Sequence, residues 1–146
     1  MIYIGCDHGG FALKQEIFKY IKEDLALEIE DLGCYDTSSV DYPDYAEKVC
    51  NKVIAENAQG ILICGTGIGI SIAANKIKGI RCALCSEPFS AEMTRKHNNA
   101  NVLAMGGRTT GSELAKSIVK AFLSTDFEGG RHQNRLDKIA ALENIK

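Results

Sequence analysis

The stretch Ile61-Leu-Ile-Cys-Gly-Thr-Gly-Ile-Gly-Ile-Ser-Ile-Ala-Ala-Asn-Lys76 changes its periodicity half-way along. Residues 61–63 are consecutive large aliphatic side chains, which is typical of a strand buried on both faces of a parallel sheet. Cys64 ends that strand, and the glycines that follow allow a tight turn and a close approach to a ligand. The next apolar residues recur at helical spacing: Ile70, Ala73, Ala74 and Ile77. The stretch therefore predicts a strand, a glycine loop and the start of a helix.

A junction of this kind can bind an anion. The first turn of a helix has unpaired N–H groups and the positive end of the helix dipole, so a phosphate or an oxyanion is stabilised there. Two alternatives stay open from the residues alone. The glycines can form a strand-to-helix turn with no ligand, or they can bind a dinucleotide. The spacing is G-x-G-x-G rather than G-x-G-x-x-G, and the loop follows the third strand, although Glu87 lies near the position of a ribose-binding acid.

Length and composition indicate one globular domain. The chain has 146 residues, 45% of them hydrophobic and 25% charged, which suffices for a substantial core. A net charge of -2 shows no excess of basic residues of the kind that binds nucleic acid or an anionic membrane. No apolar run approaches the roughly 20 residues of a membrane span. The chain enters a strand at its start without the pattern of a signal peptide, so we expect a cytoplasmic protein.

Six cysteines are scattered along the chain, and this pattern favours reduced thiols over a disulfide framework. Only Cys82 and Cys85 have the spacing of a redox or zinc pair. They lie in an expected strand over 80–85, where positions three apart point to opposite faces. We therefore interpret both as small core residues. A zinc or redox protein would need a metal or a disulfide at this pair, and no second pair completes a zinc site.

Strands and helices alternate along the chain. We expect strands over 2–6, 27–32, 61–64, 80–85 and 101–105, and helices over about 11–24, 43–57, from Ile70, 86–99, 111–124 and Leu136 to Ile145. This order predicts a single-domain α/β fold, a doubly wound, Rossmann-like three-layer sandwich with a five-stranded parallel sheet. Residues 126–146 form a helical tail whose apolar side chains suit a partner subunit.

Helical spacing also predicts which side chains of each helix face the core. Ile54 is expected to point inward from the helix over 43–57, and Leu114 from the helix over 111–124. Lys14 is expected to lie off the apolar face of the first helix.

Polar residues follow the expected strands. Asp7 and His8 leave the first strand at the carboxyl edge, where open parallel sheets bind ligands, and Arg108 follows a second glycine turn there. Arg131 and Arg135 are four apart, so on a helical turn both guanidinium groups point the same way, toward a phosphate or carboxylate. Alternatives stay open: Asp7 as a helix N-cap, His8 as a solvated loop residue and the two arginines as a solvated basic patch. Tyr42 either lines a pocket or packs its own loop.

Five motifs in order resemble one family: Gly5-Cys-Asp-His-Gly-Gly, Cys64-Gly-Thr-Gly-Ile-Gly, Ser71-Ile-Ala-Ala-Asn-Lys, His97-Asn98 and Glu128-Gly-Gly-Arg-His-Gln. Together they resemble the sugar-phosphate isomerase family that contains ribose-5-phosphate isomerase B and the allose-6-phosphate and galactose-6-phosphate isomerases. The likeness covers nearly the whole chain. It implies a Rossmann-like sheet, a homodimer or homotetramer with active sites shared between subunits, and isomerisation without a metal or organic cofactor.

The resemblance also implies roles for individual residues. Cys64 is the base that moves a proton between C1 and C2, and His97 opens the furanose ring; Asp7 and Thr66 join them among the catalytic residues. The backbone N–H groups of the loop hold the enediolate oxygens, from Gly65, Thr66, Gly67, Ile68 and Gly69. Substrate contacts come from Asp7, His8, Asn98, Arg108, Arg131 and Arg135, some of them in the neighbouring chain. One branch of the family has a glutamate where this chain has Ile70, which places the chain in the cysteine branch.

The implied chemistry agrees with the residues themselves. An aldose-to-ketose isomerisation needs a group that opens the ring, a base at carbon and donors for the enediolate oxygens. A free thiol has a pKa of about 8.5, so Cys64 needs help to act as a base, and the adjoining helix N-terminus favours its thiolate. We therefore predict a ribose-5-phosphate isomerase of the non-oxidative pentose phosphate pathway. The alternatives are an isomerase of allose or galactose 6-phosphate and a nucleotide-binding regulatory module.

Overall fold

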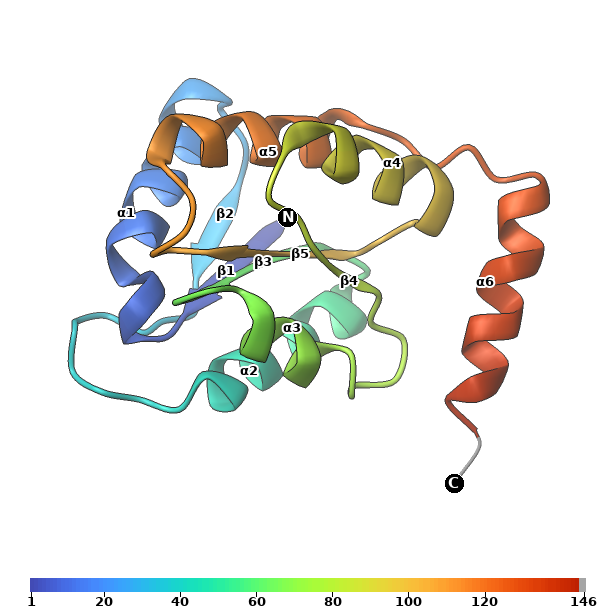
Figure 1. Cartoon of the computed structure of the whole chain (residues 1–146), viewed down its shortest axis with the longest axis horizontal. Coiled ribbons are helices and arrows are strands. Elements are labelled where there is room, and N and C mark those ends of the chain that lie inside the picture. The colour runs from blue at the N-terminus through green and yellow to red at the C-terminus, as the bar shows by residue number, and fades with distance from the viewer. Residues whose placement is uncertain (145–146) are drawn as a thin grey trace.

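A five-stranded parallel sheet forms the centre of the computed structural model, which describes residues 1–144 (Figure 1). The strands are β1 (Ile2–Cys6), β2 (Ile29–Asp31), β3 (Gln59–Cys64), β4 (Cys82–Leu84) and β5 (Val102–Gly106). Their order across the sheet is β2-β1-β3-β5-β4, and every neighbouring pair is parallel. β3 therefore lies in the middle. The predicted α/β architecture is confirmed.

Helices cover both faces of the sheet, as Figure 1 shows. On one face lie α1 (Phe11–Lys19), its π-helical continuation η2 (Tyr20–Asp24), α4 (Pro88–Asn98) and α5 (Ser112–Ser124). On the other face lie α2 (Tyr42–Glu56) and α3 (Ile68–Ala74). The result is the predicted three-layer sandwich. No helix within residues 1–144 is long and apolar enough to cross a membrane.

Successive side chains of β3 point to opposite faces of the sheet, and this decides on which face Cys64 lies. Ile61 and Ile63 pack in the core under α1, α4 and α5, whereas Leu62 and Cys64 pack in the core under α2 and α3. Successive strand residues point to opposite faces, so the four side chains divide evenly between the two cores. Cys64 consequently ends the central strand on the side that holds α3.

Both edge strands are shorter than predicted. β2 covers Ile29–Asp31 instead of 27–32, and β4 covers Cys82–Leu84 instead of 80–85. Each has a strand neighbour on one side only, so their outer residues lack the second ladder of hydrogen bonds that holds β1, β3 and β5 in the extended form.

Two side chains predicted to face the core are exposed. Ile54 is 47% exposed and Leu114 is 42% exposed. Ile54 lies over the turn at Gly79 rather than under the sheet, because a Cβ added to Gly79 would meet its Cδ1 at 2.9 Å. In α5, Ala115 takes the buried position beside Ile118, which leaves Leu114 at the border of the apolar stripe.

The last helix begins earlier than predicted. α6 covers Arg131–Leu142, whereas the sequence analysis expects a start at Leu136; its expected end, Ile145, lies outside the described residues. Gly129 and Gly130 both have positive φ, and they turn the chain into the helix. The early start has a consequence for the site, because it places Arg131 and Arg135 on successive turns of the same helix.

α6 stands beside the sandwich and not on the sheet (Figure 1). Leu136 is its buried anchor, and beyond its end the carboxylate of Glu143 accepts a hydrogen bond from the N–H of Gly79 at 3.2 Å. Between α6 and the segment before β4 is an open groove of about 780 Å³. Its apolar lining includes Ile77, Ile80, Ile139 and Leu142.

Candidate active site

Three loops meet at the carboxyl edge of the sheet, after β1, β3 and β5. Strand register pairs Cys64 with Gly106, and Cys6 with Ile63. Backbone hydrogen bonds then join the loops: the N–H of Gly107 donates to the carbonyl of Cys64 at 2.8 Å, and that of Arg108 to the carbonyl of Gly65 at 2.9 Å. The structure therefore brings together the predicted residues of the first, third and fifth strands.

Cys64 receives a backbone hydrogen bond from its own loop. The N–H of Gly67 donates to the Cys64 Sγ at 3.2 Å, and a donor aimed at sulfur stabilises a thiolate. Gly67 has φ +79, and a Cβ there would lie 2.7 Å from the backbone of Met105. Only glycine suits this position, so the donor and the thiol depend on the same glycine loop.

Arg108 lies beside the glycine loop. A Cβ added to Gly65 would lie 3.1 Å from the Arg108 Nη1, so the guanidinium covers the backbone of the loop at that point. The absence of a side chain at Gly65 is what allows this close approach. A permanently charged donor next to the start of α3 makes this edge suited to an anionic ligand.

Asp7 and His8 both have local partners. The Asp7 Oδ1 accepts hydrogen bonds from the N–H groups of Gly9 at 2.9 Å and Gly10 at 3.2 Å, so Asp7 caps the short 3₁₀ turn η1 (His8–Gly10). Asp7 is buried, and His8 is half-buried. The His8 Nδ1 accepts from the N–H of Val40 at 3.2 Å, so Nε2 is the ring nitrogen that this contact leaves free.

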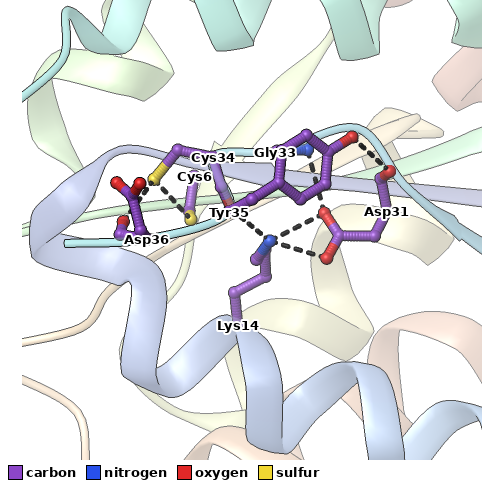
Figure 2. Close-up of polar contacts among 7 residues, drawn as sticks. All are labelled: Cys6, Lys14, Asp31, Gly33, Cys34, Tyr35 and Asp36. Atoms are coloured by element: carbon purple, nitrogen blue, oxygen red, sulfur yellow. Dashed lines mark hydrogen bonds and ion pairs between the residues drawn. The ribbon is translucent and has the colours of Figure 1, made fainter. Parts of the chain in front are cut away.

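A buried ion pair joins Lys14 of α1 to Asp31 of β2 (Figure 2). Lys14 is fully buried, contrary to the expectation that it lies off the apolar face. Its Nζ donates to both carboxylate oxygens of Asp31, at 2.7 and 2.6 Å, and to the carbonyl of Cys34 at 2.5 Å. The ring of Tyr35 lies over the ammonium at 5.2 Å. The pair thereby ties α1 to the segment after β2.

Two buried thiols lie beside this ion pair, as Figure 2 also shows. The Sγ atoms of Cys6 and Cys34 are 3.7 Å apart. Burial raises the pKa of the Cys6 thiol, although the Lys14 ammonium opposes the effect. Cys6 is fully buried at the end of β1, immediately before Asp7 in the chain, and serves as a packing residue.

Two further side chains line the outer part of the edge. Thr66 is exposed at the tip of the loop, and its Oγ1 accepts from the N–H of Ile68 at 3.3 Å. Tyr42, at the start of α2, stands beside the loop: a Cβ added to Gly69 would lie 2.9 Å from the Tyr42 hydroxyl oxygen. From the sequence alone, Tyr42 could either line a pocket or pack against its own loop. In the structure its hydroxyl lies next to the start of α3.

The other predicted residues lie at the opposite edge of the sheet. His97 and Asn98 end α4, and the carbonyl of Asn98 accepts from the Nε of Arg81, directly before β4, at 3.0 Å. β4 begins at the amino edge, so that end of α4 is also at the amino edge. An eleven-residue helix is about 15 Å long. The structure therefore does not bring His97, Asn98, Arg131 and Arg135 to Cys64 within one chain.

His97 has two neighbours that sequence reasoning did not single out. Its ring stacks on that of His132, with centroids 4.4 Å apart and planes 19° apart. The Glu128 Oε1 lies 3.8 Å from the Nε2 of His97 and 3.4 Å from the Nε2 of His132. The spacing of Glu128 and His132, four apart with two glycines between them, was the available signal.

The alternatives that involve other residues find no support in the geometry. Cys82 packs in the core under α2 and α3, and Cys85 in the core on the other face, which confirms that they are separate core residues. Burial raises the pKa of both thiols, that of Cys85 to about 11.

Glu87 caps α4 and accepts from the Ser90 N–H at 3.0 Å. Hydrogen bonds from the Ser90 side chain and backbone lower the Glu87 pKa, so this carboxylate is engaged and not free for a ribose.

Comparison with known proteins agrees with this architecture. Residues 2–139 match the model of the Ribose/Galactose Isomerase family. The chain is 52% identical to ribose-5-phosphate isomerase B of Escherichia coli over 143 residues, covering 97% of this chain and 95% of that protein. The structure of Clostridium thermocellum ribose-5-phosphate isomerase B superposes with a TM-score of 0.95 at 49% identity, covering 97% and 96% of the two chains. That of the Mycoplasma genitalium enzyme with bound ribulose-5-phosphate has a TM-score of 0.93 at 42% identity, covering 99% and 97%.

Proposed function

Because this chain belongs to the ribose/galactose isomerase family, we propose that it interconverts D-ribose 5-phosphate and D-ribulose 5-phosphate. It is an aldose–ketose isomerase, and its reaction belongs to the non-oxidative pentose phosphate pathway. One observation supports the assignment above the others. The thiol of Cys64 accepts a loop N–H at the edge of the sheet where Arg108 also lies, which supplies a base, oxyanion donors and a cation together.

In the proposed reaction Cys64 moves the proton between C1 and C2. The thiolate removes a proton from C2 of the open-chain aldose, the hydroxyl proton on O2 passes to O1 within the enediolate, and the thiol returns its proton to C1. The loop backbone from Gly65 to Gly69 donates to the enediolate oxygens, and the N–H groups of Gly67 and Ile68 first give up their bonds to the Cys64 Sγ and the Thr66 Oγ1. Each such donor contributes about 3 kcal/mol in enzymes where it has been measured. Thr66 and Asp7 act in the same half of the site, and His8 contacts the substrate through Nε2.

The half of the site at the amino edge comes from a second copy of the chain. His97 opens the furanose ring, Asn98 binds the sugar, and Arg131 and Arg135 bind the phosphate. Because these residues lie about one helix length from Cys64 in their own chain, a neighbouring subunit has to present them. We therefore propose a homodimer, or a homotetramer built from such dimers, with each active site shared between two chains.

Exposed apolar side chains support this assembly. Ile68 and Ile72 of α3, Leu84 of β4 and Phe89 of α4 are all exposed, Phe89 to 68%. Ile68 directly follows Gly67 of the glycine loop, and the Leu84 Cδ1 would lie 2.6 Å from a Cβ at Gly67. The groove beside α6 is lined by Cys82 and Ala83 of β4. A surface of this kind is the expected counterpart of the helical tail over 126–146, which we propose packs on the partner subunit within a single 1–146 domain.

The closest rival substrates are hexose 6-phosphates. Allose 6-phosphate and galactose 6-phosphate need the same base and the same donors, and they differ by one carbon, so pocket depth separates them and motifs do not. A cytoplasmic location fits the six free cysteines, which stay reduced in that compartment.

The deciding experiment is steady-state turnover by the purified chain with a chelator present. Ribose 5-phosphate, allose 6-phosphate and galactose 6-phosphate are compared at equal concentration, with Cys64→Ala beside the wild type. We expect the highest kcat/KM with ribose 5-phosphate and its collapse in the variant. A higher kcat/KM with either hexose 6-phosphate would replace ribose 5-phosphate as the proposed substrate and leave the proposed mechanism unchanged. No turnover of any of the three would overturn the proposal.

A further inference from the structure

Two imidazoles and a carboxylate converge at the end of α4. The donor atoms are the Nε2 of His97, the Nε2 of His132 and the Oε1 of Glu128, and all three lie within 4.8 Å of one another. They come from three short segments: the end of α4, the linker before α6 and the first turn of α6. All three belong to one chain, so the cluster forms without a partner subunit.

The spacing is close to what a small cation requires. Zinc bonds to imidazole nitrogen and carboxylate oxygen at about 2.0–2.2 Å, so ligand atoms around a tetrahedral ion are about 3.4 Å apart. In this chain the Glu128 oxygen lies 3.4 Å from His132 and 3.8 Å from His97. To bind one ion through both Nε2 atoms, the two imidazoles have to turn out of their present stack, in which the planes are 19° apart and the centroids 4.4 Å apart. The side chains of His97 and Glu128 are about half exposed, which leaves room for this turn.

The backbone holds the three segments in place. The N–H of Glu128 donates to the carbonyl of Lys96 at 3.1 Å, which fixes the linker against the end of α4. The N–H of His132 donates to the carbonyl of Gly129 at 3.1 Å, which fixes the start of α6. Lys96 pairs with Glu92 at 2.7 Å and not with Glu128. Among the described residues, the two imidazoles are therefore the basic side chains that lie within 4.0 Å of the Glu128 carboxylate.

We propose that His97, Glu128 and His132 form a binding site for a divalent transition metal, with Zn²⁺ as the representative ion. Two imidazoles favour zinc, copper or nickel over magnesium and calcium, which prefer oxygen ligands. Three protein ligands leave a fourth position open to water or to a phosphate oxygen. The ion is a ligand of this cluster and not a cofactor of the isomerisation.

A bound ion would inhibit turnover, and this consequence rests on the proposed function. Coordination occupies the Nε2 lone pair of His97, so the imidazole can no longer exchange a proton with the ring oxygen of the sugar. Zinc should therefore block ring opening, and a chelator should restore it. The binding site itself does not depend on the identity of the substrate.

Binding is tested directly, with the full-length reduced chain freed of metal. Zinc is titrated in competition with a chromophoric chelator at pH 7.5, and we expect one ion per chain at this site. His132→Gln and Glu128→Gln should each weaken binding by more than about tenfold, since even outer-shell partners of a metal site are worth about 10- to 100-fold. Glu113→Gln, an exposed carboxylate on α5, is the matched control and should bind like the wild type.

Cysteine is the competing ligand, and Co²⁺ separates the two cases. Cobalt bound to this cluster gives ligand-field bands without thiolate-to-metal charge transfer, whereas cobalt on a cysteine shows that band. The proposal is overturned if binding is absent, if both variants bind like the wild type, or if the thiolate band appears.

Activity assays add an independent measurement. The zinc concentration that halves turnover of ribose 5-phosphate should rise at least tenfold in Glu128→Gln relative to Glu113→Gln. Zinc binding that is lost in the variants, in a chain that turns over no sugar phosphate, would keep the metal site and reject the proposed function. Turnover without zinc binding would reject the metal site alone.

Discussion

Cys64 and His97 lie at opposite edges of the same sheet. Cys64 ends β3 at the carboxyl edge, while His97 is one residue from the end of α4 at the amino edge. The eleven residues of α4 separate the two edges by about 15 Å, too far for both groups to act on one sugar phosphate. Under the proposed function, in which Cys64 is the base and His97 opens the ring, the two groups belong to two different active sites, each completed by another copy of the chain.

Mixing two inactive variants tests this arrangement. Cys64→Ala and His97→Asn should each be nearly inactive alone. After unfolding and refolding together, random pairing makes half of the dimers mixed, and each mixed dimer has one intact site, so about one quarter of wild-type activity should return. The measurement is kcat of the mixture against refolded wild type. If each site were complete within one chain, mixing would restore nothing.

Cys64→Ala should lower kcat by about 10²- to 10⁴-fold, because it removes the base and leaves the binding groups in place. KM should change little, and the melting temperature should fall by only a few degrees because the change is small. Cys82→Ala is the matched control, since it removes a thiol in the core beneath the same two helices, α2 and α3. Equal loss of activity in both variants would show that the effect is on packing.

Arg135→Ala should weaken phosphate recognition. A hydrogen bond to a charged group is worth about 1.5–3 kcal/mol, so KM for ribose 5-phosphate should rise about 10- to 100-fold, and inhibition by inorganic phosphate should weaken in parallel. Lys138→Ala removes an exposed cation from the same helix and should leave both constants near the wild-type values. An unchanged KM in Arg135→Ala would place the phosphate elsewhere.

Sequence predicts best where one physical signal dominates. The aliphatic run 61–63 and the glycine loop after Cys64 are unambiguous, because a strand buried on both faces and a tight turn each need a narrow set of residues. Between Phe127 and Leu136 the tail has no large apolar residue, so the sequence predicts a loop where the structure has the polar first turn of α6. Two glycines at positive φ start that helix, and a sequence does not display dihedral angles.

The site was predictable only in part for a similar reason. Residues at strand ends, such as Asp7 and Arg108, can be placed at one edge from the alternation of strands and helices. Contacts between side chains distant in sequence leave no such pattern. Lys14 looks like a surface residue of an amphipathic helix, and its burial depends on Asp31, a residue of another element. The stack of His97 on His132 likewise depends on where α6 begins.

Gly10→Ala should destabilise the fold beside Asp7, whose Oδ1 accepts a hydrogen bond from the Gly10 N–H. A Cβ at Gly10 would lie 2.3 Å from the carbonyl oxygen of Ile63, in the strand that bears Cys64, and overpacking against a fixed backbone costs about 1–3 kcal/mol. Gly111→Ala is the control, because a Cβ there meets nothing within 4 Å, and the free energy of unfolding should stay within about 1 kcal/mol. Urea denaturation measures both, and equal stabilities would contradict the packing argument.

Lys14→Met should be the most destabilising of these substitutions. It leaves the Asp31 carboxylate, whose side chain is only 21% exposed, without its cation, and the carbonyl of Cys34 without its donor. Removing one partner of a buried pair costs about 3–5 kcal/mol, and partial exposure of Asp31 reduces the expected loss in free energy of unfolding to about 2–4 kcal/mol. The double variant Lys14→Met/Asp31→Asn should be more stable than Lys14→Met, since it leaves no unpaired charge behind. If the double variant is instead no more stable, the loss comes from the other contacts of the Lys14 ammonium, with the rings of Phe11 and Tyr35 and the carbonyl of Cys34, and not from the stranded carboxylate.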